Sequence, residues 1–304
     1  MALAATITVL FWGSAFAGIR AGLHSYSPAH VALLRFFVAS VILAAFAVAP
    51  RRHGVPWRHK CHGVPWRHMR LPRPQDIPLI FLLGLLGFAF YALALNIGEQ
   101  SIASGPAAVL IQTSPIWTAL AAILFLGERL RAWGWVGIAV SFVGAVVIGF
   151  GRGSGLALSW GAVLIIAAAV ASSAYSIIQK RMLDRYRPVE ITTYAIWAGT
   201  LLLLPFSGGI IGQIRTAPLG DTLAVIYLGA GPAALAYVTW AVVLSRLPAS
   251  RASSFLFVVP IVAFLVGWVW LGETPTLIDL VGGVLAIGGV ALVNTLGRAR
   301  ASAR

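Results

Sequence analysis

Apolar stretches of about twenty residues alternate with short polar connections along the whole chain. A helix of that length crosses roughly 30 Å of hydrocarbon, because each residue adds about 1.5 Å. The pattern therefore predicts an all-α integral membrane protein with ten transmembrane helices. The approximate spans are 2–20, 29–49, 77–97, 105–126, 132–150, 159–179, 190–211, 222–244, 251–271 and 277–296.

Basic residues collect in alternate connections, which predicts the orientation of the chain. Eighteen Lys and Arg side chains fall in one set of connections, whereas Arg20, Arg152 and Arg215 fall in the opposite set. Since basic loops stay in the cytoplasm, we expect both termini on the cytoplasmic side. The basic set comprises 51–76, 127–131, 180–189, 245–251 and the tail from 297.

Composition agrees with a membrane protein. Of the 304 residues, 60% are hydrophobic and 10% are charged, whereas soluble domains average about 45–50% apolar and about 25% charged residues. In a soluble domain a net charge of +14 would indicate nucleic-acid binding. Here the charge lies in the loops of a membrane protein, so we expect a lipid bilayer and no nucleic acid as partner.

The chain is internally repeated. The motif L-x-x-Y-x-P occurs at Leu23 and again at Leu183, an offset of 160, and later matches settle at an offset of 145. These matches predict two five-helix units, 1–150 and 151–304, with an insertion in the cytoplasmic loop 51–75 of the first. The later matches pair Gly84 with Gly229, Pro115 with Pro260, Glu128 with Glu273, and Gly137, Ser141 and Gly144 with Gly282, Ala286 and Gly289.

Because five is an odd number, the second unit enters the membrane from the opposite side, which predicts an inverted-topology repeat. In transporters such repeats place the substrate site near mid-membrane and support alternating access. Duplication could also serve only to build a stable bundle. The small residues of the repeat follow i, i+4, i+7 spacing, so we expect them to bring helices close together inside one chain.

Ionisable residues are scarce inside the predicted spans. No Asp, Glu, Lys or His lies near the middle of any span, which disfavours proton coupling through a central carboxylate. Arg35 is the exception. It could be a gate or an anchor for a substrate carboxylate. Alternatively, its side chain could reach the membrane interface or pair with Glu99 or Glu273, and we favour this alternative. Glu128 and Glu273 each follow a span, and we expect them to fix a tight turn.

Uncharged aromatic and polar side chains remain to line a central cavity. Such a lining suits a partly apolar ligand with polar ends, although each residue alone could also serve packing. The expected substrate-binding residues are Trp12, Ser14, Tyr91, Asn96, Gln112, Trp117, Tyr175, Tyr237, Trp240, Ser254 and Phe257. Pro115 and Pro260 interrupt matching spans and are expected to be hinges beside this site, since a proline frees a backbone carbonyl within a helix.

The sequence resembles a known family. FWGSAFAGIR in the first span, LLRFFVAS in the second, and LGE after the fourth and ninth are similar to the EamA-type members of the drug/metabolite transporter superfamily. Within it the chain is most similar to YddG-type inner-membrane exporters of aromatic amino acids. The resemblance implies a multi-pass bacterial inner-membrane protein that exports amino acids, related metabolites or amphipathic and cationic drugs through a central hydrophobic cavity.

The residues favour facilitated transport by alternating access, with no cofactor and no metal, in a chain for which a monomer is plausible. A nucleotide-sugar or sugar-phosphate carrier is the alternative, and it should carry Lys or Arg in the cavity to meet phosphate. An enzyme is not expected, because no span supplies a nucleophile with a base. A membrane scaffold or receptor would leave the inverted repeat without a role.

The loop 51–75 contains HGVPWRH twice, at 53–59 and 62–68, with Cys61 between the copies. Histidines and a cysteine can bind metal, but the copying and the prolines indicate a tolerated duplication rather than zinc-ligand spacing. Deleting residues 60–68 should leave transport unchanged, as measured by substrate flux in liposomes. Loss of flux in a normally folded variant would contradict this expectation.

Overall fold

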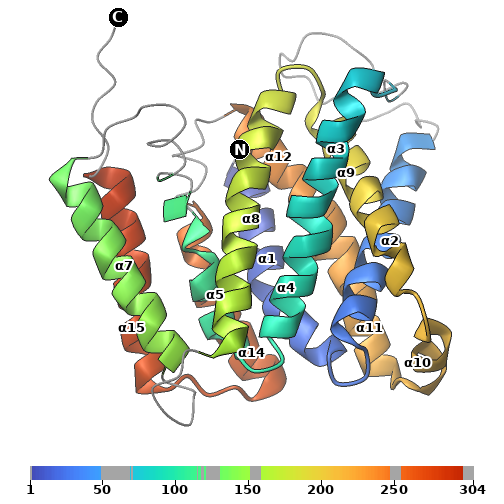
Figure 1. The fold of residues 1–304 in the computed structure, drawn as a ribbon. Helices are drawn as coiled ribbons and strands as arrows, with labels where there is room; N and C mark the ends of the chain where they lie inside the picture. The colour runs from blue at the N-terminus through green and yellow to red at the C-terminus, as the bar shows by residue number, and fades with distance from the viewer. Residues whose placement is uncertain are drawn as a thin grey trace, which may run out of the picture.

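The computed structural model describes residues 2–48, 69, 71–114, 116–117, 120, 131–150, 159–246 and 255–296. Within these ranges the chain is built from helices, and it contains no strand. The helices run roughly side by side, and most extend between the two ends of the molecule (Figure 1). The loop with the doubled HGVPWRH, Pro115, Glu128 and Ser254 lie outside the described residues.

The described residues of the first part of the chain form eight helical elements. They are α1 (Ala2–Gly22), α2 (Pro28–Val48), η1 (Pro74–Asp76), α3 (Ile77–Gly84), η2 (Leu85–Ala89), α4 (Phe90–Gly98), α5 (Ser104–Ile111) and α7 (Ala132–Phe150). The second part contributes α8 (Trp160–Met182), α9 (Pro188–Leu203), η3 (Leu204–Phe206), α10 (Ile210–Thr216), α11 (Leu219–Leu228), η4 (Gly229–Leu235), α12 (Ala236–Arg246), η5 (Leu256–Val258), α14 (Val259–Leu271) and α15 (Leu277–Thr295).

Among the described residues, six helical segments are long and apolar enough to cross a membrane, and three shorter apolar helices accompany them. The long segments are Ala2–Gly22, Pro28–Phe46, Pro74–Gly98, Trp160–Met182, Pro188–Phe206 and Leu219–Arg246, and the shorter ones are Ala132–Val147, Val259–Leu271 and Leu277–Leu292. These nine match nine of the predicted spans. Of the predicted span 105–126, the structure describes chiefly α5.

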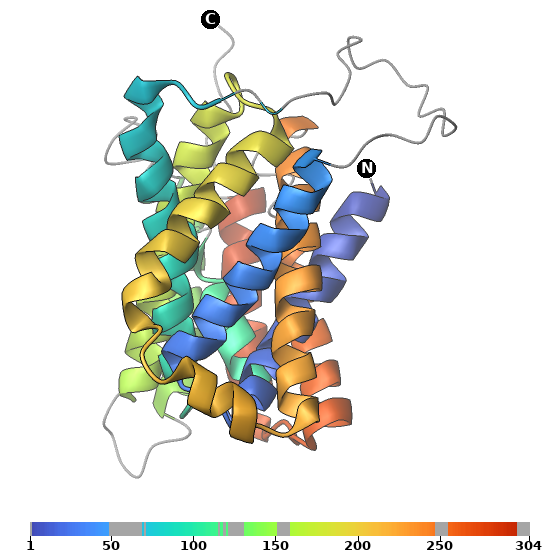
Figure 2. The same ribbon diagram turned by 90° about the vertical axis from the view of Figure 1, so that its right-hand side faces the viewer.

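One predicted boundary is wrong. The span expected at 190–211 leaves regular α-helix after Leu203, because Pro205 cannot donate a backbone hydrogen bond and Gly209 adopts a left-handed φ of 80°. The short helix α10 follows and leads across one end of the molecule to α11 (Figure 2).

Two helices that cross the core contain a π-helical segment. One is η2, between α3 and α4, and the other is η4, between α11 and α12. Adding the repeat offset of 145 to Leu85, the first residue of η2, gives position 230, which lies within η4. The two segments therefore occupy corresponding positions in the two halves of the chain. Pro232 lies inside η4 and lacks an N–H, which explains the second segment; η2 has no proline to announce it. Segments of this kind are frequent at functional sites.

Helices approach one another most closely at glycines that the repeat aligns. A Cβ on Gly84 would lie 2.7 Å from the backbone nitrogen of Gly199 in α9, and a Cβ on Gly229 would lie 2.6 Å from the carbonyl oxygen of Arg35 in α2. Between α2 and α9, the hydroxyls of Ser40 and Thr200 hydrogen-bond at 2.9 Å. These last two residues are 160 positions apart, which is the offset of the L-x-x-Y-x-P motifs.

The helices α7 and α15 form a pair at one edge of the molecule (Figure 1). A Cβ on Gly144 would lie 2.4 Å from the backbone nitrogen of Ala286, and one on Gly289 would lie 2.4 Å from the backbone nitrogen of Ser141. Only glycine permits such an approach. The prediction that these small-residue faces pack against each other within one chain is confirmed.

Adjacent glycines in α15 test this packing. In Gly289→Ala the added methyl group would meet the backbone of α7, so we expect a loss of about 1–3 kcal/mol in stability. In Gly288→Ala the methyl group has open space, and removing a helical glycine should stabilise by about 0.5–1 kcal/mol. Thermal unfolding of both purified variants in detergent measures the difference. Equal melting temperatures would contradict the close packing.

Candidate transport cavity

A cavity of about 80 Å³ lies in the middle of the bundle. Its walls come from helices of both parts of the chain: α1, α2, η2, α4 and α5 from the first, and α8, η4, α12, η5 and α14 from the second. Most of the lining is apolar or aromatic. The lining residues are Trp12, Ala15, Phe16, Ile19, Arg35, Gly87, Tyr91, Leu95, Ile111, Gln112, Ser114, Ser172, Tyr175, Ser176, Pro232, Tyr237, Trp240, Leu256 and Val259.

Aromatic rings from three helices form one continuous wall. The ring of Trp12 lies 5.1 Å from that of Tyr237 and 5.5 Å from that of Trp240, and Tyr237 lies 6.2 Å from Tyr175. The indole of Trp12 donates a 3.2 Å hydrogen bond to the carbonyl of Pro232, and the Tyr237 hydroxyl donates one of 3.4 Å to that of Gly87. Both carbonyls belong to π-helical segments, so these hydrogen bonds connect the aromatic wall to the two segments.

Two helix breaks meet at the cavity. Helix α5 ends at Ile111, and the 3-10 turn η5 begins at Leu256, which is the position that the offset of 145 pairs with Ile111. The side-chain amide of Gln112 donates a hydrogen bond to the Leu256 carbonyl. Pro260 stands in the first turn of α14, directly after η5, rather than within a continuous helix as expected. The break itself lies where the proline predicted it.

Six of the expected site residues line this cavity: Trp12, Tyr91, Gln112, Tyr175, Tyr237 and Trp240. Three do not. Ser14 bonds the hydroxyl of Tyr227, Asn96 donates to the carbonyl of Pro28 at 2.8 Å, and Trp117 packs on Phe142 with ring centres 5.5 Å apart.

These three residues lie on helix faces that do not meet the cavity. They were predicted from their depth in the spans, and depth does not indicate which face of a helix a residue is on. Ser254 lies outside the described residues, as does the side chain of Phe257. Ser172 and Ser176 also line the cavity. Ser176 was not predicted from the sequence, although it lies four residues after Ser172 and therefore on the same face of α8.

Arg35 corrects the interpretation favoured from the sequence. Its side chain is 3% exposed and lines the cavity, so it neither reaches the interface nor forms an ion pair with Glu99 or Glu273 in the structure. Glu273 is paired with Arg20 instead. The backbone of α2 explains the placement, because the carbonyl of Arg35 packs against Gly229 and fixes this turn of the helix beside η4.

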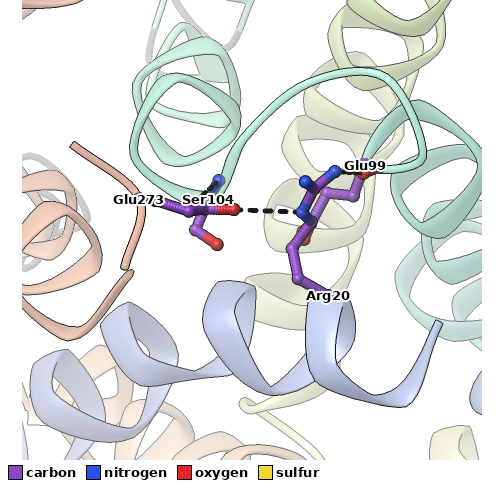
Figure 3. A network of polar contacts seen from close by, with 4 residues as sticks. All are labelled: Arg20, Glu99, Ser104 and Glu273. Carbon is purple, nitrogen blue, oxygen red and sulfur yellow. Dashed lines mark hydrogen bonds and ion pairs between the residues drawn. The ribbon is translucent and has the colours of Figure 1, made fainter. Parts of the chain in front are cut away.

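A polar network joins the ends of several helices at one end of the bundle (Figure 3). Nε of Arg20 lies 3.0 Å from Oε1 of Glu273, and Nη1 of Arg20 donates to the backbone carbonyl of Glu99. The other carboxylate oxygen of Glu273 accepts from the backbone N–H of Ser104 at 2.9 Å, at the start of α5. The network thus ties together the ends of α1, α4, α5 and α14, each of which lines the cavity farther along its length.

A related contact joins two helices at the opposite end of the bundle. The ammonium group of Lys180, near the end of α8, donates a 2.7 Å hydrogen bond to the carbonyl of Leu244 in α12. Lys180 is 160 positions after Arg20, and Leu244 is 145 positions after Glu99, so the offsets of the repeat convert one contact into the other. The two contacts thus join helices that line the cavity at opposite ends of the bundle.

The turns before the second span of each unit are also tied in related ways. Arg185 pairs with Asp76 at 3.1 Å, and Tyr186 donates to the same carboxylate at 2.8 Å. At the other end, Ser25 donates to Asp221, and the hydroxyls of Tyr26 and Thr222 lie 2.7 Å apart. In each case a turn of one unit binds the start of the third span of the other unit.

Comparison with known proteins identifies the family. The model of the EamA-like transporter family matches residues 1–150 and 159–295, which is nearly the whole chain. The chain belongs to this family. It is therefore a membrane transporter of small molecules rather than an enzyme.

Relatives of the EamA protein support this assignment. The "Probable terminal-alkyne amino-acid exporter" of Streptantibioticus cattleyicolor is 40% identical over 98% of this chain and 95% of its own length. The "Uncharacterized inner membrane transporter YedA" of Escherichia coli K12 is 30% identical over 95% of this chain and 88% of its own. The chain is a multi-pass protein of the inner membrane. A solved crystal structure of a protein with 22% identity shares the fold, with a TM-score of 0.63 over 97% of this chain and 96% of the other.

The two end contacts of this EamA transporter can be tested against each other. Cys61 is the only cysteine, so Cys61→Ser with Ser172→Cys places a single thiol in the cavity wall. Adding Arg20→Ala should increase labelling by an impermeant thiol reagent from the Arg20 side, and Lys180→Ala should increase it from the opposite side. The reason is that each change removes a cross-link at one end only.

Labelling rates in oriented membrane vesicles measure the effect, and each variant is the control for the other. Equal increases from both sides in either variant would contradict the assignment of one contact to each end.

Proposed function

We propose that this protein exports neutral amino acids, aromatic ones above all, and related metabolites or amphipathic drugs by facilitated alternating access. The observation that carries the proposal is the cavity itself. It has a wall of aromatic rings with a few amide and hydroxyl groups, a lining that suits a ligand with an apolar body and polar ends. The amino-acid exporter among the relatives supports the same class of cargo.

The proposed architecture is an inverted repeat of two five-helix units, 1–150 and 151–304, with ten transmembrane helices and cytoplasmic termini. Support comes from pairs of contacts that the two offsets interconvert: Arg20 with Glu99 and Lys180 with Leu244. The two matches to the family model, 1–150 and 159–295, divide the chain near the same boundary. The start of α1 and the end of α15 point to the same end of the bundle (Figure 1), in agreement with an even number of spans.

Size supports the view that this conformation is closed. The cavity measures about 80 Å³, whereas an apolar cavity of about 150 Å³ is known to take up benzene. An aromatic amino acid is larger than benzene, so the helices around the cavity must separate to admit it. Release of the Arg20 contact at one end, or of the Lys180 contact at the other, provides the two openings that alternating access requires.

The described lining of the cavity supports facilitated transport. None of the described residues that line the cavity is Asp or Glu, and a proton-coupled exporter usually needs a carboxylate that exchanges protons at the substrate site. A sugar-phosphate carrier should present several cations to a phosphate. Arg35 is the one cation among the described lining residues, so we place this alternative second.

Purified protein in liposomes should exchange labelled phenylalanine or tryptophan down a concentration gradient without an imposed pH gradient. Protein-free liposomes are the control. Strict dependence on a pH gradient would contradict the uncoupled mechanism. Flux of sugar phosphates without flux of amino acids would favour the sugar-phosphate carrier.

A pair of tryptophans tests the location of the site. Trp240 lines the cavity, whereas Trp117 lies outside it against Phe142. Trp240→Ala should raise the half-saturating tryptophan concentration at least about threefold, because an aromatic contact contributes about 0.5–1.5 kcal/mol beyond its area. Trp117→Ala should leave it near the wild-type value. Transport assays normalised to protein amount would contradict the site if the two variants exchanged these results.

A further inference from the structure

Arg35 is the one charged side chain among the described residues that line the cavity. It lies on α2, which the close contact at Gly229 holds against η4, and 3% of its surface is exposed. Tyr91, Gln112 and Tyr237 line the same cavity. A guanidinium keeps its charge in proteins, so burial does not convert it to a neutral group.

The guanidinium is incompletely satisfied in the closed conformation. Its Nε and Nη1 atoms are buried without a hydrogen-bond partner. The group stacks over the ring of Phe36, with Cζ 4.6 Å from the ring centre, which stabilises the charge but uses none of the N–H donors. Buried donors without acceptors are costly, so each one calls for an explanation such as a bound water, an ion or a ligand.

The acidic groups near Arg35 do not fill this role. Both carboxylate oxygens of Glu99 are buried without hydrogen-bond partners, so Glu99 accepts no hydrogen bond from Arg35. Glu273 is held by Arg20 and by the backbone of Ser104. The acceptor that would satisfy Arg35 is therefore missing from the described part of the protein.

We propose that Arg35 binds the carboxylate group of the cargo, so that the transported molecules are amino acids or other monocarboxylates. This inference rests on the proposed function and specifies its chemical class. A carboxylate brings a single negative charge and two acceptor oxygens, which match one guanidinium. The aromatic wall of Trp12, Tyr237 and Trp240 then takes the apolar side chain. A phosphate ester would carry nearly two charges into a site with one cation.

Phenylalanine and its primary amide test the proposal, because they differ only where the carboxylate stands. In liposomes, wild-type protein should transport phenylalanine at least about tenfold better than the amide, as expected for losing a charge-assisted hydrogen bond. In Arg35→Gln this preference should fall to near one while flux of the amide persists. Arg35→Lys should retain part of the preference. Arg215→Gln removes an exposed charge of the same kind and should behave as wild type.

The outcomes separate this proposal from the function on which it rests. No flux of either compound through the wild type would refute amino-acid export. Equal wild-type flux of both compounds, or an unchanged preference in Arg35→Gln, would refute the carboxylate contact and leave export standing. If Arg35→Gln does not fold, the wild-type comparison and Arg35→Lys decide.

A structural pair between Arg35 and Glu99 is the rival explanation. Glu99→Gln would then abolish the preference as fully as Arg35→Gln, and both variants would lose thermal stability together. That result would overturn the assignment of Arg35 to the cargo. A preference that survives in Glu99→Gln supports it.

Discussion

Close approach of helix backbones at small residues is the constraint on which the rest of this structure depends. Lipid chains are as apolar as leucine side chains, so helices in a membrane gain little from burying apolar surface and associate through tight packing. Gly84 against α9, Gly229 against α2, and Gly144 with Gly289 between α7 and α15 supply that packing. The second of these contacts also places Arg35 beside the cavity.

Contacts that correspond under the repeat give the molecule two similar ends. Arg20 and Lys180 each bind the carbonyl at the end of the third span in their own unit. The ends are alike but not identical, because Glu273 strengthens the Arg20 end through a second contact. In the proposed alternating access, breaking one of these contacts while the other stays formed would open the cavity to one side of the membrane at a time.

Sequence patterns predicted the helices well because span length and apolar composition are set by the membrane. They predicted less of the site, because depth in a span does not say which face of a helix meets the cavity. Trp12 and Tyr91 lie on that face, whereas Ser14 and Asn96 do not. The π-helical segment at Leu85–Ala89 has no proline to mark it. The burial of Arg35 depends on a glycine almost two hundred residues away, which only the fold brings near.

Distances between spin labels at the two ends test the central claim, that the two end contacts alternate, most directly. His24 and Gln100 flank the Arg20 contact, and the corresponding exposed positions Asp184 and Ser245 flank the Lys180 contact. With phenylalanine in proteoliposomes, double electron–electron resonance should show one distance lengthening in molecules whose other distance stays short. Distances that stay fixed, or that lengthen together at both ends, would contradict alternating access.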